Sequence, residues 1–197
     1  MTTRAAPLSA SSPGMARARP ARILLAGTLL AAGVLLAGCA SDPAVNAGPF
    51  GNGGIYGEEC ASVPPGKVLS YGFDEFRNSG SGTATIDKVA LADSRGIRIL
   101  AAYVVPITGH ELYGVLFGYP PAAHLPQGVQ WAQRQRADGA TVPRSRGSHD
   151  VTNLVLVLRP TAKTGWARGI DVYYRESGQQ YHLLTATRIR LKTTSKC

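Results

Sequence analysis

Short apolar runs separated by turn-forming residues recur along the chain from residue 68 to residue 197. Glycine, proline, aspartate and serine fill the gaps, and no stretch of 11 or more residues in this part repeats with a convincing helical period. Runs of this length and spacing are typical of an all-β fold, an antiparallel β-sandwich with about seven strands. The runs that we expect to form strands are 68–73, 83–91, 97–105, 112–117, 152–158, 169–174 and 181–191.

Two stretches differ from the others. Residues 154–158 read Leu-Val-Leu-Val-Leu, and an uninterrupted apolar run suits a central strand that is covered on both faces. Residues 118–147 contain prolines, glycines and four arginines, and they show no clear strand pattern. A loop of this length is unusual in a compact domain and often carries function, but it could hold a short strand or a helical turn near Trp131.

A local pattern supports the sandwich. Residues 76–80 (Phe-Arg-Asn-Ser-Gly) contain an Asn-x-Gly turn, and residues 84–89 (Ala-Thr-Ile-Asp-Lys-Val) follow as a strand of the Thr-Ile-x-x-Val kind. This pattern resembles one that is common in bacterial immunoglobulin-like domains. The resemblance implies an immunoglobulin-like β-sandwich and implies no activity.

Residues 1–38 are typical of a targeting segment. Three arginines between residues 17 and 22 precede an uncharged apolar run over 23–37, which is short for a bilayer span because a spanning helix needs about 20 apolar residues. The segment leads into Leu-Ala-Gly-Cys at residues 36–39. This tetrapeptide resembles the lipobox of bacterial lipoproteins. The resemblance implies that Cys39 receives a diacylglyceryl group on its sulfur and becomes the new N-terminus.

Two acyl chains on Cys39 would anchor the protein stably, whereas one chain gives only marginal membrane affinity. We therefore expect a lipid-anchored protein on the extracytoplasmic face of the cell membrane, with Met1 or Met15 as its start. The alternatives are a plain signal peptide and a membrane helix with an incidental cysteine. Residues 39–59 are rich in glycine and proline and are expected to form a flexible tether, which leaves 60–197 as the folded domain.

Charge limits the partners that such a protein could have. Four of the 21 Lys and Arg residues and none of the 12 acidic residues precede Cys39, which leaves a net charge of +5 on the exported part. This charge permits contact with anionic headgroups, an acidic polymer or another envelope protein. It does not indicate nucleic acid, which an exported protein rarely meets.

Two cysteines remain when Cys39 is set aside, and they are Cys60 and Cys197. In an oxidising compartment an even pair indicates a disulfide. Free thiols and a metal pair are the alternatives, but two cysteines without nearby histidines make a poor zinc site. We expect the disulfide.

Basic residues form the most suggestive candidate site. Arg188, Arg190 and Lys192 alternate with apolar residues on the last expected strand, so their charges should project from one side of a sheet. If these residues lie next to the arginines of the 118–147 loop, the two sets form an anion-binding surface. The alternative is a solvated face that protects a sheet edge by charge. The residues concerned are Arg134, Arg136, Arg144, Arg146, Arg188, Arg190 and Lys192.

Aromatic residues could supply a stacking platform for sugars or peptides, although core packing explains most of them equally well. The residues considered are Tyr113, Tyr119, Trp131, Trp166, Tyr173, Tyr174 and Tyr181.

No catalytic or metal-binding motif stands out. Ser148-His149-Asp150 has the residue types of a hydrolase triad, but consecutive side chains of an extended segment point to opposite faces. The histidines show no His-x-His or His-x-x-x-His spacing, so solvated loop histidines are the simpler interpretation. We predict no catalytic residue, no metal ligand and no cofactor. The four histidines are His110, His124, His149 and His182.

Three hypotheses about function follow. The first is a non-enzymatic binding or interaction module that is lipid-anchored outside the cytoplasmic membrane. The second is an envelope hydrolase whose site is assembled from distant residues, and the third is a metal-handling lipoprotein that uses the histidines. A concave pocket with convergent polar groups would favour the hydrolase, a cluster of three or more donor side chains would favour the metal protein, and an exposed basic or apolar patch would favour the binding module.

Overall fold

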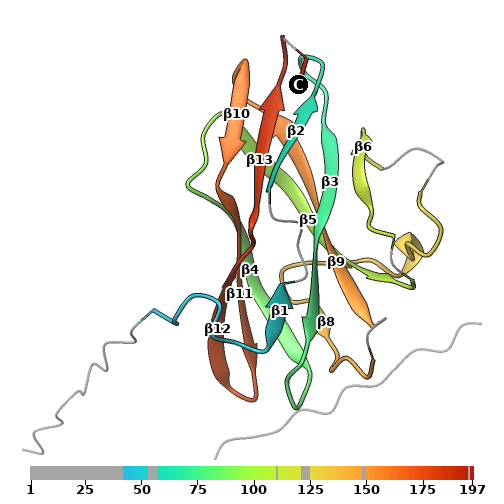
Figure 1. Cartoon of the computed structure of the whole chain (residues 1–197), viewed down its shortest axis with the longest axis vertical. Helices are drawn as coiled ribbons and strands as arrows, with labels where there is room; N and C mark the ends of the chain where they lie inside the picture. The colour runs from blue at the N-terminus through green and yellow to red at the C-terminus, as the bar shows by residue number, and fades with distance from the viewer. Residues whose placement is uncertain (1–41, 53–56, 110, 121–124, 148–149, 195) are drawn as a thin grey trace, which may run out of the picture. The chain divides into compact units, whose positions relative to one another are not determined.

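The strands form a β-sandwich (Figure 1). The structure is a computed structural model, and the residues that it describes are 42–52, 57–109, 111–120, 125–147, 150–194 and 196–197. Residues 1–41 lie outside this part, so the signal peptide, the lipobox and the lipidation of Cys39 stay predictions. Among the described residues, no helix has the length and hydropathy needed to span a bilayer.

One layer is a six-stranded antiparallel sheet. Its strands follow the order β1-β3-β9-β5-β7, and β6 pairs with the beginning of β3 while β1 pairs with its end. The bounds are β1 (Phe50–Asn52), β3 (Leu69–Asn78), β5 (Ile97–Ile107), β6 (Gly114–Phe117), β7 (Gln135–Arg136) and β9 (Val151–Pro160).

Two smaller sheets make the other layer. One has the order β12-β11-β4-β8, and the other has the order β10-β13-β2, in which β2 and β13 run parallel. The described part holds thirteen strands rather than about seven, because β1, β2, β7, β8 and β10 lie outside the expected runs and the run 181–191 forms two strands. The bounds are β2 (Gly57–Ser62), β4 (Ala84–Ala92), β8 (Thr141–Val142), β10 (Thr164–Ala167), β11 (Gly169–Glu176), β12 (Gln179–Leu184) and β13 (Thr187–Lys192).

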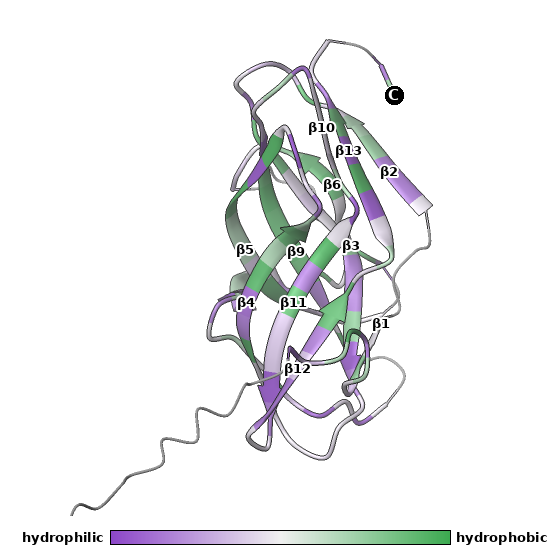
Figure 2. Ribbon diagram, turned by 90° about the vertical axis from the view of Figure 1, so that its left-hand side faces the viewer, coloured by the Kyte–Doolittle hydropathy of each residue, from purple (hydrophilic) through white to green (hydrophobic). Residues whose placement is uncertain are grey.

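Strand β9 lies at the centre of the six-stranded sheet and is buried on both faces, as its unbroken apolar run predicts. Leu154, Leu156 and Leu158 belong to the main core between the layers, whereas Val155 and Val157 belong to a second cluster on the opposite face. This division follows from the two-residue period of a strand. Figure 2 shows hydrophobic residues concentrated on β5 and β9.

The range 39–59, expected as a tether, contains β1 and the start of β2. Phe50 is only 4% exposed, and its ring stacks on Phe76 and Tyr174 with centroid distances of 4.8 and 3.8 Å. A Cβ atom at Gly48 would collide with the Tyr174 hydroxyl, so this glycine permits close approach rather than flexibility. The packed part therefore begins before Cys60.

The predicted strand 181–191 is divided in the structure. It breaks at Thr185, and its halves β12 and β13 belong to different sheets. The Thr185 hydroxyl accepts a hydrogen bond from the Ile170 backbone N–H at 3.0 Å, and the Thr185 N–H donates to the Ile170 carbonyl at 2.9 Å. These bonds fix the point at which the chain crosses from one sheet to the next.

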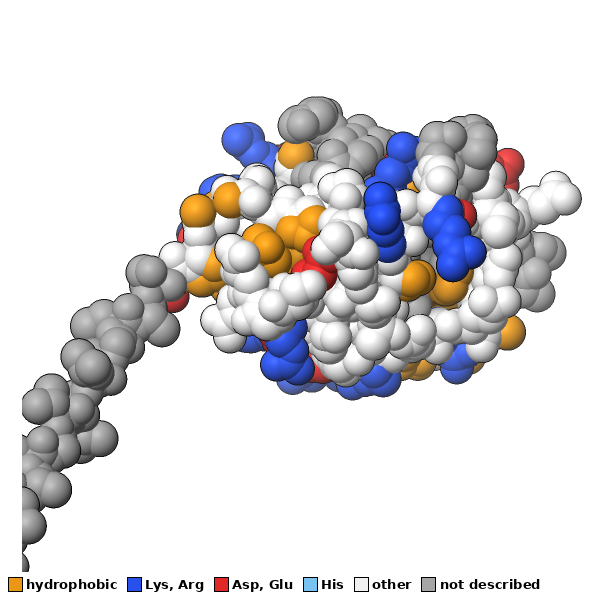
Figure 3. All heavy atoms as spheres, turned by 90° about the horizontal axis from the view of Figure 1, so that it is seen from below, with side chains coloured by type: hydrophobic (Ala, Val, Ile, Leu, Met, Phe, Trp, Pro, Cys, Tyr) orange, Lys and Arg blue, Asp and Glu red, His pale blue; other side chains and the backbone are white. Residues whose placement is uncertain are grey.

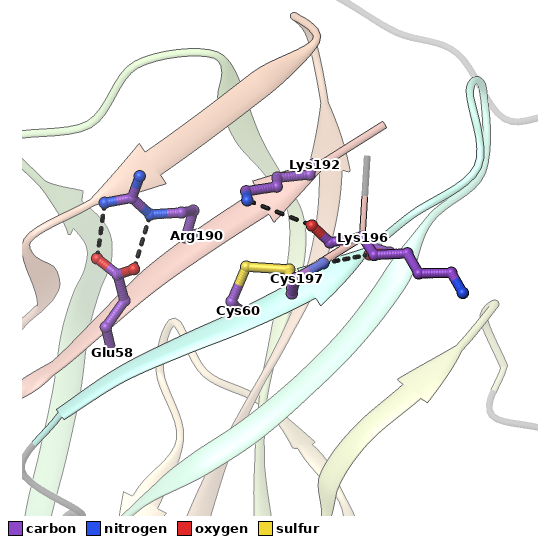
Figure 4. The surroundings of a disulfide bond; sticks show 7 residues. Glu58, Cys60, Arg190, Lys192, Lys196 and Cys197 are labelled. Atoms are coloured by element: carbon purple, nitrogen blue, oxygen red, sulfur yellow. Dashed lines mark hydrogen bonds and ion pairs between the residues drawn. A yellow bond between two sulfur atoms is a disulfide. The ribbon is translucent and has the colours of Figure 1, made fainter. Parts of the chain in front are cut away.

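Cys60 and Cys197 form the expected disulfide, with their Cα atoms 5.7 Å apart. The bond joins Cys197 to β2, which is one of the two edge strands of the three-stranded sheet (Figure 4). The Cys197 N–H also donates a hydrogen bond to the Ser62 hydroxyl at 3.1 Å. The C-terminus is therefore attached to the sheet at two neighbouring points.

Candidate functional site

The face of the six-stranded sheet that is turned away from the second layer carries aromatic and basic side chains that could bind a ligand. Its floor is the second apolar cluster, which includes Val155 and Val157. The segment after β6 and the short 3-10 helix η1 (Trp131–Gln133) pack against that floor. We call this surface the basic aromatic face, and its residues are Arg98, Tyr103, Tyr119, Trp131, Arg134 and Arg136.

Three aromatic rings form the centre of the basic aromatic face. Tyr103 comes from β5, Tyr119 follows β6, and Trp131 begins η1. The ring centroid of Tyr103 lies 5.7 Å from that of Tyr119 and 5.6 Å from that of Trp131. The Tyr119 hydroxyl donates a hydrogen bond to the Tyr103 hydroxyl. Because each ring contacts the other two, the group forms a rigid platform, and the two tyrosine hydroxyls lie together at one edge of it.

Two arginines are held against this platform. The Arg134 guanidinium carbon lies 4.9 Å from the Trp131 ring centroid, and that of Arg136 lies 5.3 Å from the Tyr103 centroid. Arg136 faces Tyr103 in the β5–β7 register and donates to its hydroxyl at 3.4 Å. Within the described part of the chain, neither arginine has a carboxylate within 4 Å. A stacked guanidinium keeps donor edges for a planar anion.

The two tyrosines of the platform show the local positive potential. Burial acts to raise the pKa of Tyr103, but hydrogen bonds from Tyr119 and Arg136 and the charges of Arg136 and Arg134 lower that pKa overall. Burial and the hydrogen bond to Tyr103 raise the pKa of Tyr119. Tyr119 is therefore the proton donor, and the environment favours negative charge at the Tyr103 oxygen.

A pocket of about 590 Å³ adjoins the platform at Tyr119. We call it the aromatic pocket. Its walls come from the turn before β3 and from the end of β6. The residues that matter here are Pro64, Lys67, Val68, Phe117, Tyr119 and Arg159.

The predicted anion-binding residues are divided among three places. Arg134 and Arg136 lie on the basic aromatic face. Arg144 and Arg146 line a different hollow of about 460 Å³, where the Asp150 carboxylate accepts a hydrogen bond from the Arg146 backbone N–H at 2.8 Å. Seen from below, the molecule shows basic side chains beside exposed hydrophobic atoms (Figure 3).

The remaining three predicted residues lie on β13, in the three-stranded sheet. The alternation is as expected, since Ile189 and Leu191 are buried. Arg190 is already paired, because its Nε atom lies 2.7 Å from a Glu58 carboxylate oxygen (Figure 4). The hydrogen bond from Arg190 lowers the pKa of Glu58. These residues lie in a different sheet from Arg134 and Arg136, so the two sets do not form the single surface that the sequence left open beside a solvated face.

The aromatic residues also separate. Tyr113, Tyr119 and Trp131 lie on the outer side of the six-stranded sheet, where Tyr113 is buried. The others make contacts elsewhere: Tyr173 stacks on His182, Tyr174 on Phe50 and Tyr181, and Trp166 lies near Arg95.

The sequence patterns did not identify five residues of the basic aromatic face and of the aromatic pocket beside it. Two of them could have been found from the strand pattern, because Arg98 follows the start of an expected strand and Arg159 directly follows the apolar run 154–158. Both stand at positions that alternate with buried leucine or isoleucine. The missed residues are Lys67, Arg98, Tyr103, Phe117 and Arg159.

Most of the candidate catalytic and metal-binding residues lie outside the part of the chain that the structure describes. Ser148, His149, His110 and His124 lie outside the described residues. His182 bonds the Asp171 carboxylate at 2.7 Å. In the described part of the chain, no three His, Cys, Asp or Glu side chains are grouped to hold a metal ion.

Comparisons with known proteins add little. No protein-family model matches the chain, and no curated protein matches its sequence. Among solved structures, the ASH / PapD-like domain of human CEP192 (PapD-like domain 7) is similar at 11% identity and a TM-score of 0.37, over 76% of this chain and 87% of that one. A likeness this distant shows neither a family nor a function, and the sandwich is established by the strand pairing.

Proposed function

We propose that the protein is a lipid-anchored, extracytoplasmic binding module that holds an anionic ligand on the basic aromatic face. The observation that carries the proposal is the placement of Arg134 and Arg136. Both guanidinium groups are fixed against aromatic rings, and neither is neutralised by a carboxylate among the described residues. Charged groups arranged in this way are complementary to carboxylate, sulfate or phosphate.

The platform beside the arginines suggests the kind of ligand. Ring faces of tyrosine and tryptophan pack against the flat apolar sides of sugars, and guanidinium edges bind acidic substituents. An acidic polysaccharide offers both features in each repeat.

Reversing both charges tests the ligand. We expect Arg134→Glu/Arg136→Glu to weaken binding of polygalacturonate to the full chain at least tenfold, because two charge-assisted contacts are lost and two repulsions are gained. Titration calorimetry at low and moderate salt measures the effect. Arg144→Glu/Arg146→Glu is the matched control, since it makes the same charge change in another hollow and should bind within about threefold of wild type. Equal loss in both variants would mean that net charge alone drives binding.

Replacing the acylated cysteine tests the anchor. We expect Cys39→Ser to move the protein from the membrane fraction to the soluble fraction, because the sulfur that carries the acyl chains is removed. Fractionation followed by immunoblotting measures this. The Cys60→Ser/Cys197→Ser variant, which keeps Cys39, should stay with the membrane. Unchanged retention of Cys39→Ser would refute lipid anchoring.

A further inference from the structure

We propose that the aromatic pocket is a separate subsite for a small organic anion, in which a carboxylate, phosphate or sulfonate is attached to an aromatic or acyl body. The inference rests on the proposed function in one respect, because Tyr119 belongs to both the aromatic pocket and the platform. It goes further by naming a second site with its own ligand chemistry.

The walls of the aromatic pocket are held in place by backbone geometry. The Lys67 N–H donates to the Pro64 carbonyl at 3.1 Å, which closes the turn before β3. On the other wall, the Gly118 N–H donates to the Val68 carbonyl at 3.0 Å. Gly118 has a φ of 89°, which residues with a side chain rarely adopt. The hollow is therefore preformed rather than opened by a ligand.

One side of the aromatic pocket is apolar and exposed. Phe117 is 59% exposed and Tyr119 is 37% exposed. Among the described residues, only four large hydrophobic side chains are exposed, and these two lie together at one pocket. Exposed aromatic rings that are grouped around a hollow are typical of a binding site, because a ligand removes their apolar surface from water.

The other side of the aromatic pocket is cationic and lacks a counter-charge. Arg159 faces Arg98 directly in the β5–β9 register, and like charges opposite one another destabilise a sheet. Within the described residues, no carboxylate lies within 4 Å of Arg98, Arg159 or Lys67. The Arg159 Nε atom is buried and has no hydrogen-bond partner there. An anion bound at the Arg159 guanidinium would offset the repulsion between Arg98 and Arg159.

The volume of the aromatic pocket limits which ligands it can hold. A volume of about 590 Å³ falls in the range of roughly 300–1,000 Å³ that is usual for small-molecule sites. One aromatic or short acyl group with an acidic substituent fits this space. The apolar body would lie against Phe117 and Tyr119, and the acidic group would reach Arg159 and Lys67.

Titration calorimetry of the full chain in non-ionic detergent with naphthalene-2-sulfonate tests the subsite. We expect saturable binding by the wild-type protein, and 2-naphthylmethanol, which lacks the charge, should bind at least tenfold more weakly. Lys67→Glu and Phe117→Ser should each weaken sulfonate binding at least tenfold. Both substitutions are at exposed positions, so the variants should fold, which circular dichroism verifies.

The control variant separates the two sites. Arg134→Glu/Arg136→Glu should bind naphthalene-2-sulfonate within about threefold of wild type while losing polygalacturonate. No saturable binding by the wild type, or sulfonate binding that is unchanged in both Lys67→Glu and Phe117→Ser, would overturn the subsite. In either case, polygalacturonate binding that still depends on Arg134 and Arg136 would leave the proposed function standing.

Discussion

Replacing both Cys60 and Cys197 with serine is expected to lower the free energy of unfolding by up to about 5 kcal/mol. The disulfide joins residues that are 137 positions apart, so the reduced chain gains a large amount of conformational freedom when it unfolds. The bond also attaches the C-terminus to β2, which pairs with β13 alone in its sheet. We therefore expect amide exchange in β2 to rise more than amide exchange in β9.

Urea unfolding monitored by circular dichroism measures the loss. Wild-type protein treated with a reductant should match the double-serine variant, because both lack the same bond. Cys39→Ser is the control, since it removes a cysteine without touching the bridge. A double-serine variant that unfolds within about 1 kcal/mol of the oxidised wild type would show that the cross-link contributes little to stability.

The parts of the fold that sequence patterns predict are those in which burial alternates along a strand. Residues 154–158 become the central strand β9, because only a position covered on both faces tolerates five apolar residues in a row. The turn after β3 and the strand β4 lie where the pattern at 76–89 places them. These features depend on neighbours within a few residues, so they can be inferred from one chain.

The first packed strand could not be inferred in this way. Gly48 and Phe50 lie in a glycine-rich stretch, and composition alone favours a spacer there. What fixes them is Tyr174, more than 120 positions later, whose hydroxyl accepts the Phe50 N–H at 3.0 Å. A glycine selected for close approach and a glycine in a flexible linker have the same sequence signature.

The candidate site shows the same limit. Alternation correctly puts the β13 basic residues on one side, but it does not say which strands lie beside β13. Arg136 comes to Tyr103 because β7 pairs with β5, and Arg159 comes to Arg98 because β9 pairs with β5. Strand order is a long-range property, so the seven predicted residues could not be sorted into three places from local patterns.

A second large effect is expected from Asp74, a fully buried carboxyl group in β3. It accepts a hydrogen bond from the Tyr71 hydroxyl at 3.4 Å. Burial raises the pKa of Asp74 to about 6, and hydrogen bonds from Thr187, Thr185 and Tyr71 offset only part of that rise. The folded state therefore holds this proton more tightly than the unfolded chain, whose carboxyl has a pKa of about 3.9.

The sign of the pH dependence follows from this difference. Asp74 contributes stability below about pH 4, loses it as the pH rises from about 4 to 6, and above that range leaves a buried carboxylate. A shift of roughly two units corresponds to about 2–3 kcal/mol. We expect the free energy of unfolding of wild type minus that of Asp74→Asn to fall by about this amount between pH 4 and pH 7, because asparagine does not titrate.

Parallel urea titrations of both proteins at pH 4, 5, 6 and 7 measure that difference without requiring asparagine to pack as well as aspartate. Asp138→Asn, a substitution at an exposed carboxylate in the turn after β7, is the matched control. The difference between its free energy of unfolding and that of wild type should change much less with pH. If the difference in free energy of unfolding between wild type and Asp74→Asn stays constant across these pH values, Asp74 does not carry a raised pKa in the folded protein. A free-energy difference that falls steeply between about pH 4 and pH 6, with its midpoint near pH 5, would instead show that the carboxyl ionises inside the sandwich, where burial desolvates its charge.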